Sequence, residues 1–377
     1  MKTYFYTIIL LCAFVHVGPV NAQSERQCST SIFSPILDKN GQPMTLAPSA
    51  PTAEPSSKTV ALATTVSVYS IKDIETTIQK NQTLQPEVLA IYKRMIEQGE
   101  SRYVLMPNRL EALDQLVETM PNFKQVVDEL KKSLAVSIHA QEAIHFPPII
   151  LLGSPGVGKT YFAEQLANSI GAGHEFVSMS SITAGWILSG ASASWKGAQM
   201  GRVARTLIEK DTANPVIILD EIDKASGGRD YDPLGPLYQL LEYDTARRFR
   251  DEYLQIDVDA SRINWVATAN DISAVPDAIR SRALIFTIPN PDTPQLRVIT
   301  ANVLKQYLKK HPKLEFSGEI AESVFLMLKD QSPREIRKLI ESGVGSALIR
   351  GRRNLETEDI DLGLLREEKV PEKRIGF

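Results

Sequence analysis

The sequence contains almost no cysteine, and this scarcity excludes two classes of protein. The only two cysteines, Cys12 and Cys28, lie near the N-terminus of a 377-residue chain. The body of the chain therefore has neither a disulfide framework nor thiolate ligands for zinc. The five histidines are scattered without the spacing of metal ligands, so we interpret them as ordinary core or surface residues.

A basic excess is missing as well. The chain has 42 Lys and Arg residues against 45 Asp and Glu residues, which gives a formal net charge of −3. Proteins dedicated to nucleic-acid binding usually carry a net positive charge, so this balance argues against that class. The length allows two or three domains, and an apolar content of 43% is sufficient for a sizeable core.

The N-terminus is typical of a secretory signal. Residues 1–22 contain an early lysine, an apolar run and small residues before Gln23, and the run is short for a transmembrane helix. The alternative is a later translation start at Met44, within a stretch rich in proline, serine and alanine. The two interpretations imply different compartments, and the chemistry below bears on the choice.

Changes in pattern divide the chain into five segments. They are a signal-like leader (1–60), a mainly helical segment (61–146), an α/β domain (147–290), a small all-α domain (291–365) and a charged tail (366–377). In the third segment, short apolar runs such as PIILLG and PVIILD alternate with helical patterns. This alternation predicts a doubly wound parallel sheet.

The mainly helical segment has its own local signals. β-Branched residues alternate within 61–75, which indicates a strand, and helical spacing begins at Pro86. Asn108 is a predicted N-cap, with Glu111 three residues later completing a capping box. A further helix is predicted over residues 122–138.

The stretch GSPGVGKT follows a predicted strand and opens a predicted helix, which is the context that a phosphate-binding loop requires. Its glycines allow backbone N–H groups to converge on phosphate oxygens, and the helix N-terminus adds favourable partial charge. A chance glycine-rich turn is the alternative, and the agreement of motif and context disfavours it. The predicted nucleotide-binding residues are Gly153, Ser154, Pro155, Gly156, Val157, Gly158, Lys159 and Thr160.

Two adjacent carboxylates, Asp220 and Glu221, end the apolar run PVIILD. Carboxylates beside a buried strand are costly unless they have partners or a function. We expect Asp220 and Thr160 to ligate Mg²⁺, Lys159 to reach the phosphates, and Glu221 to polarise the water that attacks the γ-phosphate. The alternative for the pair is a strand end that simply meets water, which the phosphate loop upstream disfavours.

Two polar residues on other segments are candidates for the same site. Asn270 ends the run INWVATAN, where its amide can position the attacking water or cap a turn before Asp271. Arg334 starts a helix of the predicted small domain. There are two alternatives for Arg334 at this position. Its side chain reaches back to the nucleotide, or it only forms an ion pair with Glu335 or Asp330.

An arginine before the last predicted strand is a candidate for action on a neighbouring subunit. Arg282 lies in PDAIRSR, just before the run LIFTIP, and Arg280 is the competing candidate. A cation supplied from a neighbour stabilises the charge that develops on a transferred phosphoryl group. The alternative is ordinary solvation of an arginine at the surface.

Together these segments resemble the AAA+ ATPases, and most closely the ATPase module of the Lon family, over about residues 120–365. The phosphate loop and the acidic pair are general to that superfamily, whereas LLEYDTARRFRDEYL followed by ATAN is much more Lon-like. The resemblance implies ATP and Mg²⁺ as cofactors, and a homo-oligomeric ring, usually a hexamer, with sites between subunits. The matching positions are Lys159 and Thr160 (phosphate loop), Asp220 and Glu221 (acidic pair), Asn270 (first sensor), Arg282 (arginine finger) and Arg334 (second sensor).

The stretch SASWKGAQMG places a tryptophan among small and polar residues, where it has little local reason to be buried. The resemblance to the Lon family implies that this stretch is a pore loop. Trp195 then occupies the aromatic position of the family's loop, and Gly197 occupies its glycine position. Lys196 departs from the family, which usually has an aliphatic residue there. An aromatic side chain can grip an extended polypeptide without sequence preference. The alternative is that Trp195 packs into the core.

The sequence thus predicts a Lon-like AAA+ ATPase that remodels, unfolds or translocates protein substrates. The chain ends soon after the small domain, so we expect no peptidase domain within it and allow a separate peptidase or an adaptor. Because hydrolysis requires ATP, we favour a cytoplasmic protein, with no membrane role unless the N-terminal segment is retained. Two alternatives remain: a nucleic-acid-directed motor or loader that uses Lys196, and a scaffold that binds ATP without hydrolysing it.

Overall fold

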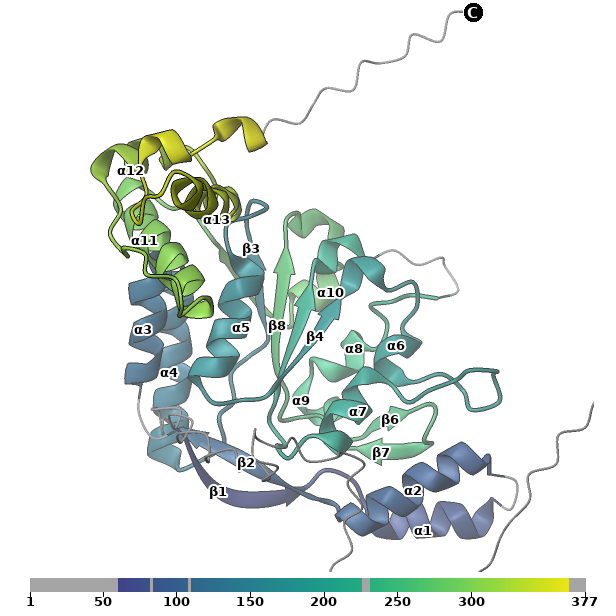
Figure 1. The fold of residues 1–377 in the computed structure, drawn as a ribbon. Helices are drawn as coiled ribbons and strands as arrows, with labels where there is room; N and C mark the ends of the chain where they lie inside the picture. The colour runs from purple at the N-terminus through teal and green to yellow at the C-terminus, as the bar shows by residue number, and fades with distance from the viewer. Residues whose placement is uncertain (1–59, 82–83, 108–109, 226–230, 366–377) are drawn as a thin grey trace, which may run out of the picture. The chain divides into compact units, whose positions relative to one another are not determined.

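The computed structural model describes four stretches of the chain, residues 60–81, 84–107, 110–225 and 231–365 (Figure 1). The chain divides into two units, residues 1–56 and 57–377, and all described residues belong to the second. The signal-like segment, Met44, Asn108 and the charged tail lie outside the described residues. Within the described stretches, no helix has the length and apolar character needed to cross a membrane.

Five parallel strands form the central sheet, in the order β4-β5-β8-β3-β9 (Figure 1). Strands β3, β5, β8 and β9 correspond to the runs PIILLG, PVIILD, INWVATAN and LIFTIP, and the predicted α/β fold is confirmed. The middle strand of the sheet is β8, and every residue of it is buried. The strands are β3 (Ile149–Leu152), β4 (His174–Ser178), β5 (Val216–Asp220), β8 (Asn264–Ala269) and β9 (Leu284–Thr287).

The sheet separates two hydrophobic cores, because successive side chains of a strand point to opposite faces. Ile149 and Leu151 pack in one core with α3, α4 and α5, whereas Ile150 packs in the other with α7. Both faces of the sheet are therefore covered, which explains why the inner strands β3 and β5 are almost continuously apolar. The helices named here are α3 (Glu111–Thr119), α4 (Lys124–Ala140), α5 (Lys159–Ser169) and α7 (Arg202–Glu209).

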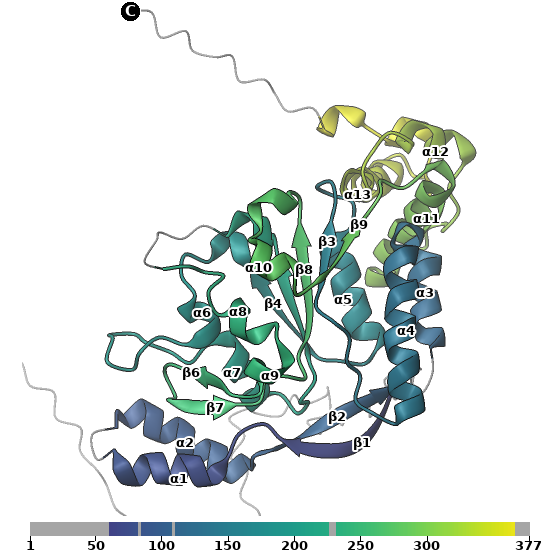
Figure 2. The ribbon, with the colours of Figure 1, turned by 180° about the vertical axis from the view of Figure 1, so that it is seen from behind.

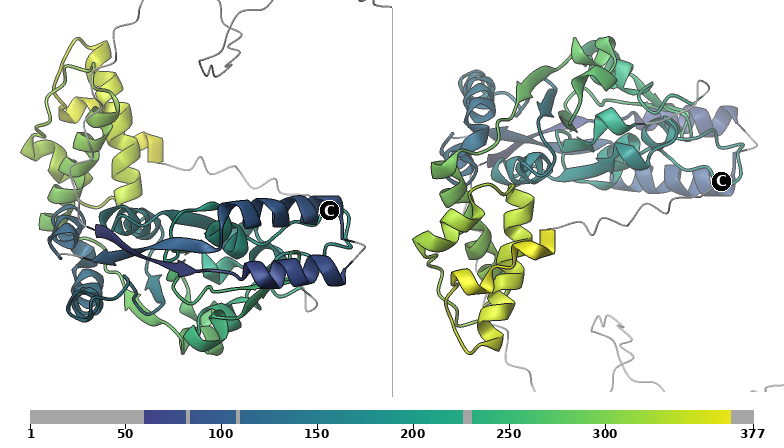
Figure 3. Two further views of the ribbon diagram at one scale, coloured as in Figure 1. Left: turned by 90° about the horizontal axis from the view of Figure 1, so that it is seen from below. Right: turned by 90° about the horizontal axis from the view of Figure 1, so that it is seen from above.

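The N-terminal part combines two helices with a two-stranded ribbon. Strand β1 (Val60–Ser67) pairs antiparallel with β2 (Ser101–Pro107). Helices α1 (Ile71–Lys80) and α2 (Pro86–Gln98) connect the two strands in the chain and lie side by side beyond one end of the ribbon (Figure 3). The predicted strand over 61–75 is therefore only partly correct, because the Ser70 side chain caps α1 and ends the extended stretch.

Two features of this part differ from the sequence analysis. Strand β2 was not predicted, and its pairing with β1 and a bridge from Tyr103 to Thr212 stabilise it. Helix α3 begins at Glu111 with Leu110 before it, so the predicted capping box from Asn108 is wrong. Arg102 is buried and donates to the carbonyl oxygens of Leu207 and Ile208, which joins the ribbon to the C-terminal end of α7.

The C-terminal part is all-helical, as predicted, and has its own hydrophobic core (Figure 2). It contains α11 (Thr293–Lys310), α12 (Glu322–Leu328) and α13 (Pro333–Ile349). Capping boxes at Asp292 and Ser332 fix the starts of α11 and α13. Besides several 3-10 turns, the remaining short α-helices and strands of the described chain are α6 (Trp186–Ser189), α8 (Leu237–Leu240), α9 (Tyr243–Ala246), α10 (Asp277–Arg280), β6 (Phe249–Asp251) and β7 (Ile256–Val258).

Candidate active site

The stretch GSPGVGKT forms the loop between β3 and α5. Strand β3 lies between β8 and β9, where the direction of strand addition reverses, and ligands of open α/β sheets bind at such switch points. Gly158 is the N-cap of α5 and has a left-handed φ of 104°. Because its conformation is left-handed, a glycine is favoured there, and the loop can present its backbone at the helix N-terminus.

Lys159 lies at the centre of this loop. Its Nζ donates to the carbonyl oxygens of Gly153 at 2.7 Å and Ser154 at 3.0 Å, and to Asn270 Oδ1 at 2.9 Å. Burial lowers the pKa of the Lys159 ammonium, while the carboxylates of Asp223 and Asp220 oppose that shift. The geometry thus places a buried cation where phosphate oxygens can replace its present acceptors, and it brings Asn270 into the same site.

Asp220 is held by hydroxyl groups from two other elements. Its Oδ1 accepts from Thr160 Oγ1 at 2.6 Å and from Thr268 Oγ1 at 2.8 Å. A hydroxyl beside a carboxylate fits Mg²⁺, which prefers oxygen ligands and usually keeps waters and substrate phosphates as its other ligands. No cluster of three or more His, Cys, Asp or Glu residues suited to a metal occurs in the described part of the chain. The Thr160 hydroxyl and the Asp220 carboxylate are oxygen donors of the kind that suits Mg²⁺ bound together with a nucleotide.

Glu221 follows Asp220 in a left-handed conformation, with φ of 55°. Its backbone N–H donates to Thr268 Oγ1 at 2.9 Å, so one hydroxyl bonds to both members of the acidic pair. A left-handed conformation is uncommon for a residue other than glycine, and a hydrogen bond from the neighbouring strand stabilises it here. Thr268 was not predicted, since nothing in its own segment shows that β8 lies beside β5.

A cavity of about 240 Å³ unites these residues with others from the helical parts. Arg334 lines it from α13, and the backbone N–H of Arg334 donates to the carbonyl oxygen of Gly156 at 3.3 Å. Arg337 also lines it and lies over the Tyr161 ring at 5.3 Å. Cationic groups thus share the cavity with an apolar wall, formed by Met120, Phe123, Val157, Ile299 and Val303.

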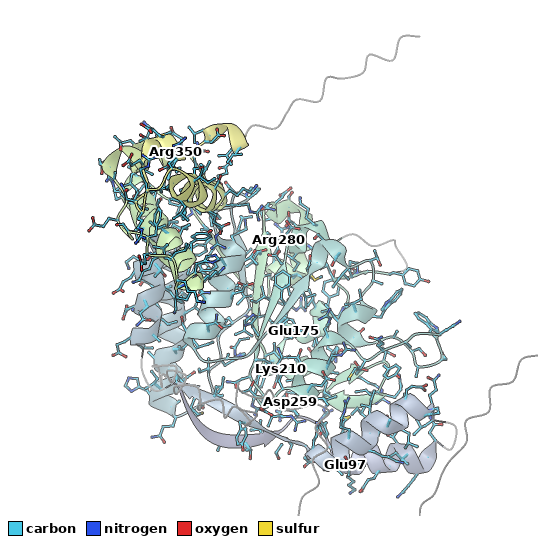
Figure 4. All side chains as sticks on the ribbon, viewed as in Figure 1. Glu97, Glu175, Lys210, Asp259, Arg280 and Arg350 are labelled. Atoms are coloured by element: carbon cyan, nitrogen blue, oxygen red, sulfur yellow. The ribbon has the colours of Figure 1, made fainter. Side chains whose placement is uncertain are left out.

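The two candidate arginines before β9 do not line this cavity. Arg282 forms an ion pair with Glu242, with 2.8 Å between Nε and Oε1 but without hydrogen-bond alignment. Arg280 pairs with Asp277 within α10, and Figure 4 labels its position. Among the described residues, the cavity of this chain is therefore lined without Arg282 and Arg280.

The stretch with Trp195 forms an exposed loop. The Trp195 side chain is 51% exposed, so the alternative that it packs into the core is wrong. Its ring lies edge-on to Trp186 at 5.5 Å, and Trp186 lies edge-on to Tyr231 at 5.1 Å. Trp186 and Tyr231 were not predicted to lie beside this loop, because they come from separate stretches of the sequence.

Replacing Thr268 with Val tests the hydroxyl that joins the acidic pair. The change keeps the side-chain shape but removes one hydrogen bond to Asp220 and one from the Glu221 backbone. We expect ATP turnover to fall about tenfold, since hydrogen bonds to charged groups are the strong ones. Thr300→Val is the matched control, because that buried hydroxyl bonds only to the Leu296 carbonyl of its own helix. An equal loss in both variants would contradict the assignment.

The fold and the site together define a P-loop nucleotide-binding domain. Residues 149–289 match the family described as "ATPase family associated with various cellular activities (AAA)". The chain therefore contains an AAA-family ATPase domain, related in sequence to the ATPase module of Lon proteases.

Curated relatives support this relation. The Lon protease of Campylobacter concisus is 39% identical over 163 residues, which are 42% of this chain and 20% of that protein. The Lon protease of Flavobacterium johnsoniae is 30% identical over 239 residues, which are 62% of this chain and 27% of that protein. The chain thus matches about a quarter of the length of such relatives.

Solved structures give a weaker likeness. The Thermotoga maritima RuvB Holliday junction branch migration motor is 17% identical, with a TM-score of 0.42. The match covers 63% of this chain and 66% of that one. A similarity of this size carries no functional inference.

Proposed function

We propose that the protein is a Lon-like AAA+ ATPase that hydrolyses ATP with Mg²⁺ and uses the energy to remodel, unfold or translocate protein substrates. The observation that carries this proposal is the single cavity that brings together the phosphate loop, the acidic pair, Asn270 and Arg334. These groups come from four separate stretches of the chain, and each has a distinct role in phosphoryl transfer.

The roles follow from position and chemistry. Lys159 and the backbone of the phosphate loop bind the phosphates, and Thr160 with Asp220 holds Mg²⁺. Glu221 orients and polarises the attacking water, and Asn270 helps to position it. Bound Mg²⁺ supplies charge neutralisation on the phosphate oxygens. Arg334 contacts the nucleotide from the helical domain and reports its state to that domain.

The proposed assembly is a homo-oligomeric ring of six subunits, in which Arg282 completes the site of the adjacent subunit. Two observations support it: Arg282 does not line the cavity of its own chain, and its pair with Glu242 is partly exposed. Partly exposed ion pairs contribute little free energy, so Arg282 can leave Glu242 at small cost.

Trp195 is the proposed substrate contact. It is a half-exposed aromatic side chain on a loop supported by a second tryptophan. Contact through an aromatic ring suits unfolded polypeptides of many sequences. Protein substrates, and a separate peptidase or an adaptor, are the proposed partners, and the cytoplasm is the proposed compartment because ATP is available there.

Trp195→Ala tests this contact. We expect an unfolded protein to stimulate the ATPase of the parent chain and to leave the variant near its basal rate, because the aromatic contact is lost. Tyr103→Ala is the matched control, since Tyr103 is 47% exposed on β2, away from the loop. The measurement is the steady-state ATPase rate with and without a permanently unfolded protein.

The same assay discriminates the alternatives. Stimulation by DNA alone, with a steep loss at higher salt, would favour the nucleic-acid motor that uses Lys196, which also lies exposed in this loop. An ATPase rate that does not depend on Glu221 would favour the ATP-binding scaffold. Neither outcome is expected, because the charge balance and the complete set of hydrolytic groups both disfavour it.

A further inference from the structure

The Trp195 loop has a narrow neck, formed where residues 190 and 201 meet. The Ala191 N–H donates to the Gln199 carbonyl at 3.1 Å, which closes the loop from inside. A Cβ added to Gly201 would overlap the carbonyl oxygen of Leu188 and lie 2.5 Å from the Gly190 nitrogen. The two glycines are therefore required by close backbone approach, and the chain enters and leaves the loop at one point.

The Asp251 carboxylate lies directly against this neck. Oδ2 accepts from the Gly201 N–H at 2.8 Å, and a Cβ added to Gly190 would lie 2.7 Å from Oδ1. Oδ1 accepts from the N–H groups of Tyr253 at 3.0 Å and Leu254 at 2.9 Å. The carboxylate thus bonds one end of the loop, at Gly201, to the turn between β6 and β7, and it packs closely against the other end at Gly190.

Asp251 is fully buried, and within the described residues no lysine or arginine forms an ion pair with it. Burial raises the pKa of this carboxyl to about 6, although the three backbone N–H groups favour the charged form. A buried carboxylate without a cationic partner is costly, and the three backbone hydrogen bonds offset part of that cost. The hydrogen bond from Gly201 connects the Asp251 carboxylate to a segment outside its own turn.

The turn that carries Asp251 is fixed on its other side. The Tyr92 hydroxyl of α2 donates to the Leu254 carbonyl, and Tyr92 is fully buried. Asp259, labelled in Figure 4, follows β7, and its backbone N–H donates to the Val68 carbonyl at 2.8 Å. The Glu252 N–H donates to the Ser189 carbonyl at 2.8 Å. The neck is thus held against a rigid support, while Trp195 at the other end of the loop stays exposed.

We propose that Asp251 is a positioning residue for substrate handling, whose carboxylate holds the neck of the Trp195 loop so that movement of the ATPase domain reaches Trp195. This inference rests on the proposed role of Trp195 as the substrate contact. Without the hydrogen bond from the Gly201 N–H to the Asp251 carboxylate, the loop bends at its neck. Movement of the ATPase domain is then not transmitted to Trp195. Asp251 touches neither nucleotide nor polypeptide in this arrangement.

Asp251→Asn in the full chain is the test, and Asp257→Asn is the matched control. Asparagine keeps an oxygen for the Tyr253 and Leu254 N–H groups but turns an amide donor toward the Gly201 N–H. Asp257 carries the same group on β7 of the same hairpin, half-exposed and paired with Arg250 at 3.2 Å. The readouts are tryptic cleavage after Lys196, assigned by mass spectrometry, and the ATPase rate with and without unfolded protein.

For Asp251→Asn we expect cleavage after Lys196 to accelerate about tenfold, since a buried donor loses its acceptor. Stimulation by unfolded protein should disappear, while the basal ATPase rate stays within about twofold. Asp257→Asn should match the parent chain in both readouts. Unchanged cleavage after Lys196, or a parallel fall of basal rate and thermal stability without new cleavage, would overturn the proposal. The cleavage readout does not depend on stimulation, so failure of the proposed function is recognised separately.

Hydrogen exchange of the parent chain keeps the proposal testable if Asp251→Asn fails to fold. We expect the amide of Gly201 to exchange far more slowly than the amides of residues 192–196, because it is held by a buried carboxylate. Equal exchange rates at these positions would show that the neck opens as readily as the loop tip and would refute the clamp.

Discussion

Replacing Glu221 with Gln is expected to lower ATP turnover on the order of a hundredfold to ten-thousandfold, the range for loss of a general base. ATP binding should remain, because the phosphate loop and Asp220 are intact. The change keeps the shape of the side chain and its backbone bond to Thr268. The measurement combines the ATPase rate with the dissociation constant of a fluorescent ATP analogue.

Glu209→Gln is the control for this prediction. Glu209 makes a half-exposed ion pair with Arg94 at 3.6 Å, at the end of α7 and outside the cavity. Its loss should change neither turnover nor binding. If Glu221→Gln hydrolysed ATP at the parent rate, the catalytic assignment would be wrong and the scaffold alternative would gain support.

Replacing Arg282 with Ala is expected to reduce turnover about a thousandfold, the scale for a cation that stabilises the transferred phosphoryl group from a neighbour. Arg280→Ala is the matched control, because Arg280 pairs with Asp277 within its own helix and should keep most of the activity. The reverse outcome, with Arg280 essential and Arg282 dispensable, would exchange the two assignments.

Mixing the two inactive variants tests whether Arg282 acts between subunits. A site in a mixed ring is active when its own chain supplies Glu221 and its neighbour supplies Arg282. Random assembly of equal amounts therefore restores about a quarter of the parent activity. A mixture that stays inactive, although light scattering shows mixed rings, would place the action of Arg282 within its own chain.

Much of the fold was predictable because its signals are local. The apolar runs of the sheet, the glycines of the phosphate loop and the helix start near Arg334 each depend on neighbours within a few residues. Strand β2 was missed because its stability comes from pairing with β1, about forty residues earlier in the sequence.

The candidate site divides in the same way. Lys159, Asp220 and Glu221 could be predicted because each lies in a short motif whose residue types and spacing indicate phosphate and Mg²⁺ binding. Thr268 could not, since its hydroxyl matters only because β8 lies beside β5 in the sheet. The same holds for Asp251, whose carboxylate has a partner in Gly201 fifty residues away.

The sequence by itself determined the parallel α/β domain, the phosphate loop and the acidic pair, because residue spacing within a few turns of chain dictates them. Only the tertiary structure decided which residues meet at the carboxyl edge of the sheet, that Arg282 does not line the cavity of its own chain, and that Asp251 accepts a hydrogen bond from Gly201 at the neck of the Trp195 loop. Strand order and the packing of distant helices fix those contacts, and no local pattern carries that information.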